Sequence, residues 1–223
     1  LSNTAAMADH WLPTWPGSEP VLFLCWARMI MEKGLVNREF VENQVNWQDW
    51  MNAVHSNEEC TYERFLELLL DEYAEYTPEY AAEECRIPVE QVIEAGEAVA
   101  NSGTKLCTHV WRSAAIGNLG GWQVSRTLHF LNVLTGSVGT EGGTAPNSWS
   151  KFKPELFDVP PDPDGWNELH FPPEYMLAHF EMSHILPHLV KDGRGTMDVY
   201  FTRVFNPVWT YPDGFSWMEM LQN

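Results

Sequence analysis

The stretch "MDVYFTRVFNP", residues 197–207, decides the predicted fold because a β-strand pattern ends there in an Asn-Pro turn. Its β-branched and aromatic residues are typical of a buried strand. The stretch "TKLCTHVW", residues 104–111, is an earlier strand candidate. Helical patterns cover 121–135, 174–193 and the segment from 213 onward. This order predicts a doubly wound α/β fold with a mostly parallel sheet.

A helical portion precedes the predicted sheet. The run "PVLFLCWARMIMEKG", residues 20–34, is apolar on nearly all sides and predicts a buried helix that Gly34 ends. Further helices are predicted at 37–45, 61–76, 77–85 and 88–103, and a loop or irregular helix between 46 and 57. We therefore expect a mainly helical part at 1–103 and an α/β dinucleotide-binding-like part at 104–223, with a long loop at 144–173.

Composition and charge exclude several classes of partner. The 31 acidic and 13 basic residues give a net charge of −18, which repels nucleic acid and anionic membranes. The longest apolar run is too short to span a bilayer. The four cysteines lie more than twenty residues apart, so no ligand spacing typical of an iron–sulfur or structural zinc site is present, and neither site is expected in this segment by itself. Because the chain begins without Met and stops with no obvious closing element, we expect an incomplete fragment of a larger multidomain protein.

A glycine-rich loop follows the helical pattern at 121–135. Its sequence "GSVGTEGG" spans 136–143. Because it follows a helix, it is not the strand-first motif of a dinucleotide fold. Glycine permits close approach of backbone N–H groups to phosphate or pterin oxygens, but such clusters also simply end helices. The candidate cofactor-binding residues of this loop are Gly136, Ser137, Gly139, Glu141, Gly142 and Gly143.

A second candidate site is the Pro-Gly turn in "WLPTWPGSEP", residues 11–20. The turn, with Gly17 and Ser18, brings Glu19 to the start of a helix. A carboxylate there can accept two hydrogen bonds from the N1–H and amino group of guanine. The alternative is a glutamate that the helix dipole favours in the first turn.

Polar residues follow each predicted strand. Asn206 and Pro207 would lie at the carboxyl edge of a parallel sheet, where open α/β folds bind ligands, or they form an ordinary turn. After the earlier strand, Arg112 could pair with a phosphate. His109 and Trp111 could stack on a heterocycle or fill the core.

A metal site is an alternative function for the helical pattern at 174–193. Glu181, His184 and His188 lie at helical spacing and could ligate the metal of a hydrolase. Pro187 interrupts that stretch, and no glutamate directly follows His184 as in the HExxH motif. Packed or hydrogen-bonded histidines are the favoured interpretation.

Four stretches in order resemble the molybdopterin oxidoreductases of the dimethyl sulfoxide reductase type: "TAAMADHWLPTWPGSEPVLFLCWARMIMEKGLVNREFVENQVNW", "YTPEYAAEECRIPVEQVIEAGEAVA", "QVSRTLHFLNVLTGSVGTEGG" and "VYFTRVFNPV". The resemblance covers most of 1–144 and resumes at about 196–221. It implies molybdenum or tungsten held by two molybdopterin guanine dinucleotides across α/β domains. It also implies an iron–sulfur cluster in a part of the enzyme outside this chain, and a small-molecule substrate.

The resemblance carries over to individual positions. Glu19 matches a guanine-binding aspartate, and Ser137 replaces an asparagine of the pattern "LTGN-G-GG" near a pterin or its phosphates. Asn206 and Pro207 match a nucleotide-binding loop, while Gln123 and Arg126 match the preceding helix. The stretch "GNLGGW" replaces a Gln-His-Thr-Asn-Gly stretch of many members, so a histidine-assisted mechanism is not supported. No catalytic residue is assigned.

The expected partners are the rest of the same enzyme and an iron–sulfur electron-transfer subunit. Two alternatives stay open, namely a cofactor-free scaffold subunit and a non-redox hydratase or hydroxyl transferase. The location, periplasmic or cytoplasmic, soluble or peripheral to a membrane complex, also stays open.

Overall fold

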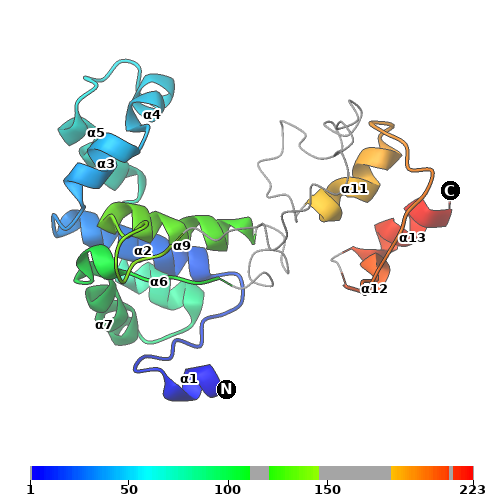
Figure 1. Ribbon diagram of the computed structural model, residues 1–223, viewed down its shortest axis with the longest axis horizontal. Coiled ribbons are helices and arrows are strands. Elements are labelled where there is room, and N and C mark those ends of the chain that lie inside the picture. The colour runs from blue at the N-terminus through cyan, green and yellow to red at the C-terminus, as the bar shows by residue number, and fades with distance from the viewer. Residues whose placement is uncertain (1, 111–120, 146–181, 211–212, 223) are drawn as a thin grey trace, which may run out of the picture. The chain divides into compact units, whose positions relative to one another are not determined.

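The computed structural model describes residues 2–110, 121–145, 182–210 and 213–222, and its regular elements there are helices (Figure 1). Within these ranges, no segment forms a β-strand, and the one β-bridge joins Val138 to Thr144. Both predicted strands are therefore wrong in their described parts. Residues 103–105 form a 3₁₀ turn, and 197–205 have irregular backbone. The doubly wound parallel sheet is not the fold of this chain.

The reason for this difference is that a strand needs a hydrogen-bonding neighbour. β-Branched and aromatic residues favour extended backbone, but they do not supply a second strand. In the segment 103–108, the backbone instead bonds to side chains: Ser137 Oγ accepts from the Leu106 amide at 3.1 Å, and Thr144 Oγ1 accepts from the Thr108 amide at 2.9 Å. The described part of the predicted strand at 104–111 is therefore held by hydrogen bonds to side chains and not by a neighbouring strand.

The chain divides into two compact units, one of Leu1–His109 with Arg126–Asn147 and the other of Val110–Ser125 with Ser148–Asn223. The predicted boundary near residue 103 stays a prediction. The first unit contains the helices α1 (Asn3–Met7), α2 (Glu19–Glu32), α3 (Arg38–Gln44), α4 (Trp47–Val54), α5 (Tyr62–Glu72), α6 (Pro78–Cys85) and α7 (Val89–Ala100), the 3₁₀ helix η1 (Gly103–Lys105) and most of α9 (Trp122–Thr135).

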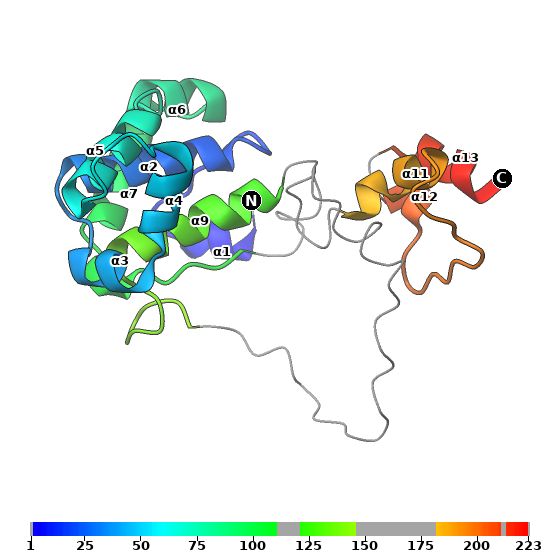
Figure 2. The same ribbon diagram turned by 90° about the horizontal axis from the view of Figure 1, so that it is seen from above.

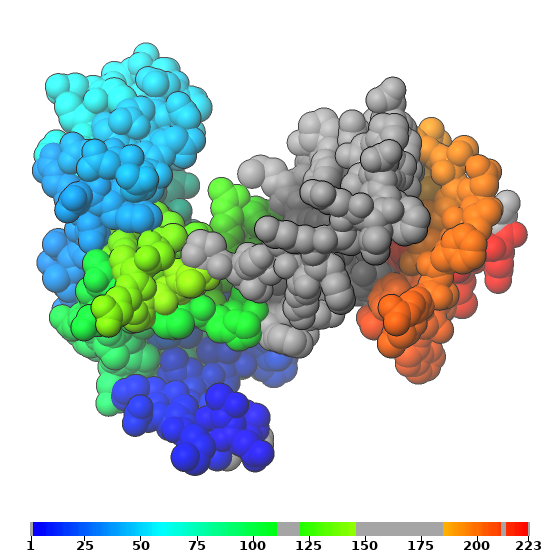
Figure 3. Space-filling view, viewed as in Figure 1, coloured from blue at the N-terminus to red at the C-terminus, as the bar shows by residue number. Residues whose placement is uncertain are grey.

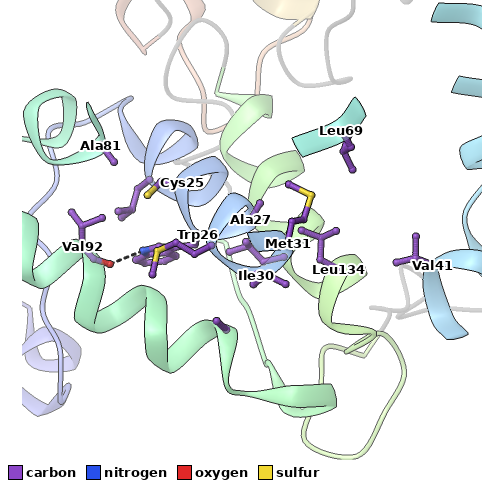
Figure 4. Packing of buried hydrophobic residues seen from close by; sticks show 14 of the residues in the cluster. Cys25, Trp26, Ala27, Ile30, Met31, Val41, Leu69, Ala81, Val92 and Leu134 are labelled. Atoms are coloured by element: carbon purple, nitrogen blue, oxygen red, sulfur yellow. Dashed lines mark hydrogen bonds between the residues drawn. The ribbon is translucent and has the colours of Figure 1, made fainter. Parts of the chain in front are cut away.

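Helix α2 forms the centre of the first unit, as its apolar sequence predicted. In the view from above, α2 lies between α6 and α9 (Figure 2). Cys25, Ala27 and Ile30 are fully buried, and the Trp26 indole donates a hydrogen bond to Val92 O of α7 at 2.9 Å (Figure 4). This bond satisfies the one polar atom of a large buried ring. Leu131 and Leu134 of α9 join the same core.

Helices α4 and α5 share an aromatic cluster. The Trp47 ring lies 5.6 Å from Phe65 and 6.0 Å from Tyr62, measured between ring centroids. Of the two alternatives predicted between 46 and 57, a loop or an irregular helix, the loop is wrong for 47–54, which is the α-helix α4. Burial of Trp47 and Met51 explains the difference, because tertiary packing stabilises a helix with weak local signals.

The second unit, described by itself, contains α11 (Met182–Lys191), α12 (Pro207–Thr210) and α13 (Gly214–Gln222). Trp217 of α13 and Leu189 of α11 are buried, and Lys191 Nζ lies 3.1 Å from Glu219 Oε1. Among the described helices of the chain, none is long and apolar enough to cross a membrane.

Candidate functional site

The Pro-Gly turn before α2 has the predicted conformation. The Ser18 amide donates to Trp15 O at 3.0 Å, and Gly17 has a φ of +94°. Proline followed by a residue of positive φ is the signature of a type II turn. The Glu19 carboxylate folds back, and its Oε2 accepts a hydrogen bond from the Gly17 amide at 2.8 Å. In the described part of the chain, no donor lies on Oε1, so this oxygen is available to a ligand.

The end of α6 holds this turn in place. Cys85 O accepts a hydrogen bond from the Trp15 amide at 3.0 Å, and the Cys85 thiol lies 3.5 Å from Ser18 O. Burial raises the pKa of the Cys85 thiol, which keeps it protonated and able to donate. The Arg86 guanidinium lies 4.1 Å from the centre of the Trp15 ring. The end of α6 therefore contacts both the backbone of the turn and the side chain of Trp15.

The glycine loop starts as the C-cap of α9. Gly136 has a φ of +68°, and a Cβ added there would lie 2.5 Å from Asn37 Nδ2, so only glycine fits. The Asn37 amide donates to Leu134 O at 2.7 Å, next to this cap. The alternative interpretation, a glycine that ends a helix, is therefore correct for Gly136.

The rest of the loop closes on itself. The Thr144 amide donates to Ser137 O at 2.8 Å, and the Gly139 amide donates back to Thr144 O at 2.9 Å. A Cβ added at Gly143 would lie 2.6 Å from Ser137 O, so this glycine permits the closure. A Cβ added at Gly139, with a φ of +71°, would meet nothing within 4 Å. The loop lies at the molecular surface, in lime green in Figure 3.

Several loop amides have no partner among the described residues. The described hydrogen bonds of the loop include none from the amides of Val138, Thr140, Glu141 and Gly142. Three of these four are consecutive, and Gly142 has a φ of +80°. Successive free N–H groups form a concavity that suits an anion. Free backbone N–H groups are the reason why this glycine-rich sequence was a candidate for cofactor binding.

A buried polar network fixes the loop to the preceding segment. Asn132 and Ser137 are completely buried. Asn132 Nδ2 donates to Leu106 O at 2.7 Å, and the Ser137 hydroxyl donates to Gly103 O at 3.0 Å. The Thr108 hydroxyl donates to Asn132 Oδ1 at 2.5 Å. Every bond joins positions far apart in sequence, so the network sets the shape of the loop and Ser137 holds it from inside.

Lys105 was missed by sequence reasoning. A Cβ added at Gly142 would lie 3.3 Å from Lys105 Cβ, so the stem of this lysine lies against the loop. The Lys105 side chain is exposed and takes part in none of the ion pairs between described residues. The sequence holds no signal for this contact, because Lys105 is far from the loop along the chain and reaches it only through the fold.

The first unit therefore has two separate groups of candidate residues. Glu19 starts α2, whereas the glycine loop lies beside Asn37, shortly after α2 ends (Figure 1). Helix α2 has 14 residues, so the two groups are about 20 Å apart at the usual rise per residue. The two groups could contact opposite ends of one long ligand, or two ligands.

The remaining candidate cofactor-binding residues lie in different structural environments. His109 is exposed, and Trp111 and Arg112 lie outside the described residues. In the second unit, Asn206 O accepts hydrogen bonds from the amides at 209 and 210, and the buried Pro207 begins α12. An Asn-Pro turn is thus the local structure at that point.

The metal alternative gains no support from the described residues. Glu181 and the side chain of His184 lie outside them, and His188 Nε2 lies 2.9 Å from Asp213 Oδ2. No group of three or more His, Cys, Asp or Glu in the described ranges is arranged to hold a metal ion.

Comparison with known proteins finds related reductases. The chain is 26% identical over 144 residues to a probable dimethyl sulfoxide reductase chain of Escherichia coli, covering 64% of this chain and 18% of the relative. It is 29% identical to a periplasmic nitrate reductase of Desulfovibrio desulfuricans, covering 65% and 18%. It is 28% identical to the molybdopterin-containing subunit of an arsenate respiratory reductase of Chrysiogenes arsenatis, covering 64% and 17%.

The chain is similar to the molybdopterin oxidoreductases of the dimethyl sulfoxide reductase type. The resemblance expected from the four sequence blocks is therefore confirmed. The names of the relatives also agree with the predicted oxidoreductase class. No family model matches the chain. The matched part of the chain spans less than a fifth of the length of these relatives.

Proposed function

We propose that this chain is part of the catalytic subunit of a molybdenum or tungsten oxidoreductase and holds part of a bis(molybdopterin guanine dinucleotide) cofactor. The observation that carries the proposal is the Glu19 carboxylate, which a type II turn holds at the start of α2 with Oε1 open to a ligand. The relatives supply the class of enzyme, since one of them is a molybdopterin-containing reductase subunit.

The turn fits a guanine edge. Guanine offers two adjacent N–H donors, and an ionised carboxylate offers only acceptors. Oε2 keeps a further lone pair after it accepts from the Gly17 amide, so both oxygens can take part. A Cβ added at Gly17 would meet nothing within 4 Å, which leaves the backbone open to a ligand there.

The glycine loop fits the phosphates of a dinucleotide. It combines the free amides at 140–142 with the exposed Lys105, whose aliphatic stem lies against Gly142. We assign the phosphate contact to these amides and to Lys105, and the shaping of the loop to Ser137 and the network behind it. Gly139 leaves room for close approach of the ligand to the backbone.

The bound cofactor would supply oxygen-atom or hydride-equivalent transfer at the metal, with electrons relayed through the pterins. The residues of this chain would bind and orient the cofactor, and the apolar helices behind the loops would exclude water. His109, Trp111, Arg112, Asn206 and Pro207 stay candidates for further contacts. An iron–sulfur cluster elsewhere in the enzyme, a small-molecule substrate and an electron-transfer subunit belong to the same proposal.

The decisive experiment replaces Glu19 with alanine in the full-length enzyme and measures molybdenum, tungsten and guanine nucleotide per protein. A hydrogen bond to a charged group contributes about 1.5–3 kcal/mol, so occupancy should fall when cofactor is limiting. Glu90→Ala is the matched control, because Glu90 is a glutamate in the first turn of α7. Equal cofactor content in the Glu19 variant and the wild type would remove Glu19 from the site.

The alternatives give different results in the same measurement. A cofactor-free scaffold subunit would contain neither metal nor pterin in the wild type. A non-redox hydratase or hydroxyl transferase would contain the cofactor but would not reduce a substrate with an artificial electron donor.

A further inference from the structure

Trp15 carries a large aromatic ring four positions before Glu19. The residue is 55% exposed, although it begins the turn that positions the carboxylate. The Arg86 guanidinium lies over the ring at 4.1 Å from its centre, which is the geometry of a cation–π pair. A large apolar ring is therefore held at the surface by a cation on one face.

The backbone of Trp15 is fixed as well. Its amide donates to Cys85 O, and its carbonyl accepts from the Ser18 amide and, at 2.6 Å, from the Ser18 hydroxyl. Because these bonds restrain the residue before any ligand arrives, little further entropy is lost when a ligand contacts the ring. The first and fourth residues of a β-turn lie within about 7 Å at their Cα atoms, so Trp15 and the start of α2 are neighbours.

We propose that Trp15 is the stacking surface for the purine base whose edge Glu19 binds. This inference rests on the proposed function. Stacking uses the face of a base, whereas the N–H donors of guanine point outward in its plane, so one base can contact the ring and the carboxylate together. Arg86 acts through Trp15 by holding the ring and by occupying its other face.

Trp11 provides a comparison within the same segment. Its side chain is 51% exposed, close to the value for Trp15, but it lies outside the turn. In the described part of the chain, neither a cation nor another ring lies against Trp11. If exposure of an indole alone were enough for base binding, the two residues would behave alike.

The test measures binding of GMP and AMP to the full chain, purified from cells that make no pterin cofactor, by calorimetric titration. Base stacking on an aromatic ring does not depend on the edge of the base, so Trp15→Ala should weaken both nucleotides by roughly tenfold or more. Trp15→Phe should recover most of the affinity, and Trp11→Ala should change neither value. Arg86→Ala should weaken both nucleotides to a smaller extent.

The Glu19→Gln variant separates this inference from the proposed function. It should weaken GMP but not AMP, because only guanine offers the paired donors to the carboxylate. If Trp15→Ala leaves both affinities unchanged while Glu19→Gln still loses the preference for GMP, only the stacking role is overturned. A loss of both nucleotides in Trp15→Ala with no effect of Glu19→Gln would remove the guanine contact. A wild-type chain that binds neither nucleotide would overturn both.

Discussion

The Ser137 hydroxyl accepts a hydrogen bond from the Leu106 amide at 3.1 Å, across 31 positions of sequence. The same hydroxyl donates to Gly103 O at 3.0 Å and lies 2.8 Å from the Thr135 hydroxyl. Because this side chain is completely buried and has this many partners, it fixes the glycine loop to the segment 103–106. The shape of the candidate phosphate loop therefore depends on a residue that faces away from solvent.

Replacing Ser137 with alanine should lower the free energy of unfolding by about 1–3 kcal/mol, because the Leu106 amide loses its partner. Urea denaturation followed by circular dichroism measures the change. Thr140→Ala is the control: its exposed hydroxyl bonds to Thr104 O in the same loop, and its loss should stay within about 0.5 kcal/mol. Equal effects of the two substitutions would contradict the role of the network.

Gly96 of α7 permits the close packing of α2. A Cβ added there would lie 2.6 Å from Trp26 Cδ1 and 2.7 Å from Met29 Sδ. The Trp26 ring cannot shift freely, since its indole is bonded to Val92 O. We expect Gly96→Ala to destabilise the chain by about 1–3 kcal/mol, more than the gain of about 1 kcal/mol in helix propensity.

Thermal unfolding measures the effect of Gly96→Ala. Gln91→Ala, at an exposed position of the same helix, should leave the midpoint almost unchanged. A higher midpoint for Gly96→Ala would show that helix propensity outweighs the contact with Trp26.

Burial raises the pKa of the Cys25 thiol to about 12 from its usual value near 9. The folded state thus favours the neutral thiol, and its contribution is complete below pH 9. As the pH rises from 9 toward 12, the unfolded chain releases the proton first and stability falls. Urea midpoints at pH 8 and pH 10.5 should differ less in Cys25→Ala than in the wild type. Cys60→Ala, which changes an exposed thiol, should keep the wild-type difference.

Lys105→Ala should reduce cofactor content in the full-length enzyme, because the phosphates would lose the cation whose aliphatic stem lies against Gly142. Lys105→Arg should retain most of it. Since exposed ion pairs are screened by salt, the difference between Lys105→Ala and the wild type should shrink when both are dialysed at high ionic strength. Molybdenum and phosphorus analysis provides the measurement. Lys33→Ala is the control, because Lys33 pairs with Glu97 at 2.8 Å; a similar loss in both variants would indicate a general charge effect.

Local signals in the sequence predicted the helical part well. Thr77 caps α6, with its hydroxyl accepting from the Tyr80 amide, and proline occupies the first turn, at the point where the helix at 77–85 is predicted to begin. Asn37 caps α3 in the same way. Ser18 has the predicted position before α2, but its hydroxyl donates to Trp15 O instead of capping the helix. Caps and stops depend on residues within one turn, so a single sequence shows them.

Features that depend on distant residues were not predictable in this way. The strand pattern at 104–111 does not show that Ser137 and Thr144 bond to its backbone. The packing of Trp47 on Phe65 likewise joins two helices and makes α4 regular. For the candidate site, the sequence indicated the Pro-Gly turn and the glycine loop, but not Lys105 or the separation along α2. These depend on how the chain folds back on itself.

The bond between the Asn37 amide and Leu134 O joins the N-cap of α3 to the last turn of α9, just before the glycine loop. A ligand that binds the loop only in its closed form would therefore be thermodynamically linked to the docking of α9 onto the core. Saturation with such a ligand would slow proteolytic cleavage and amide hydrogen exchange in α2 and α9, and not only in the loop that it contacts.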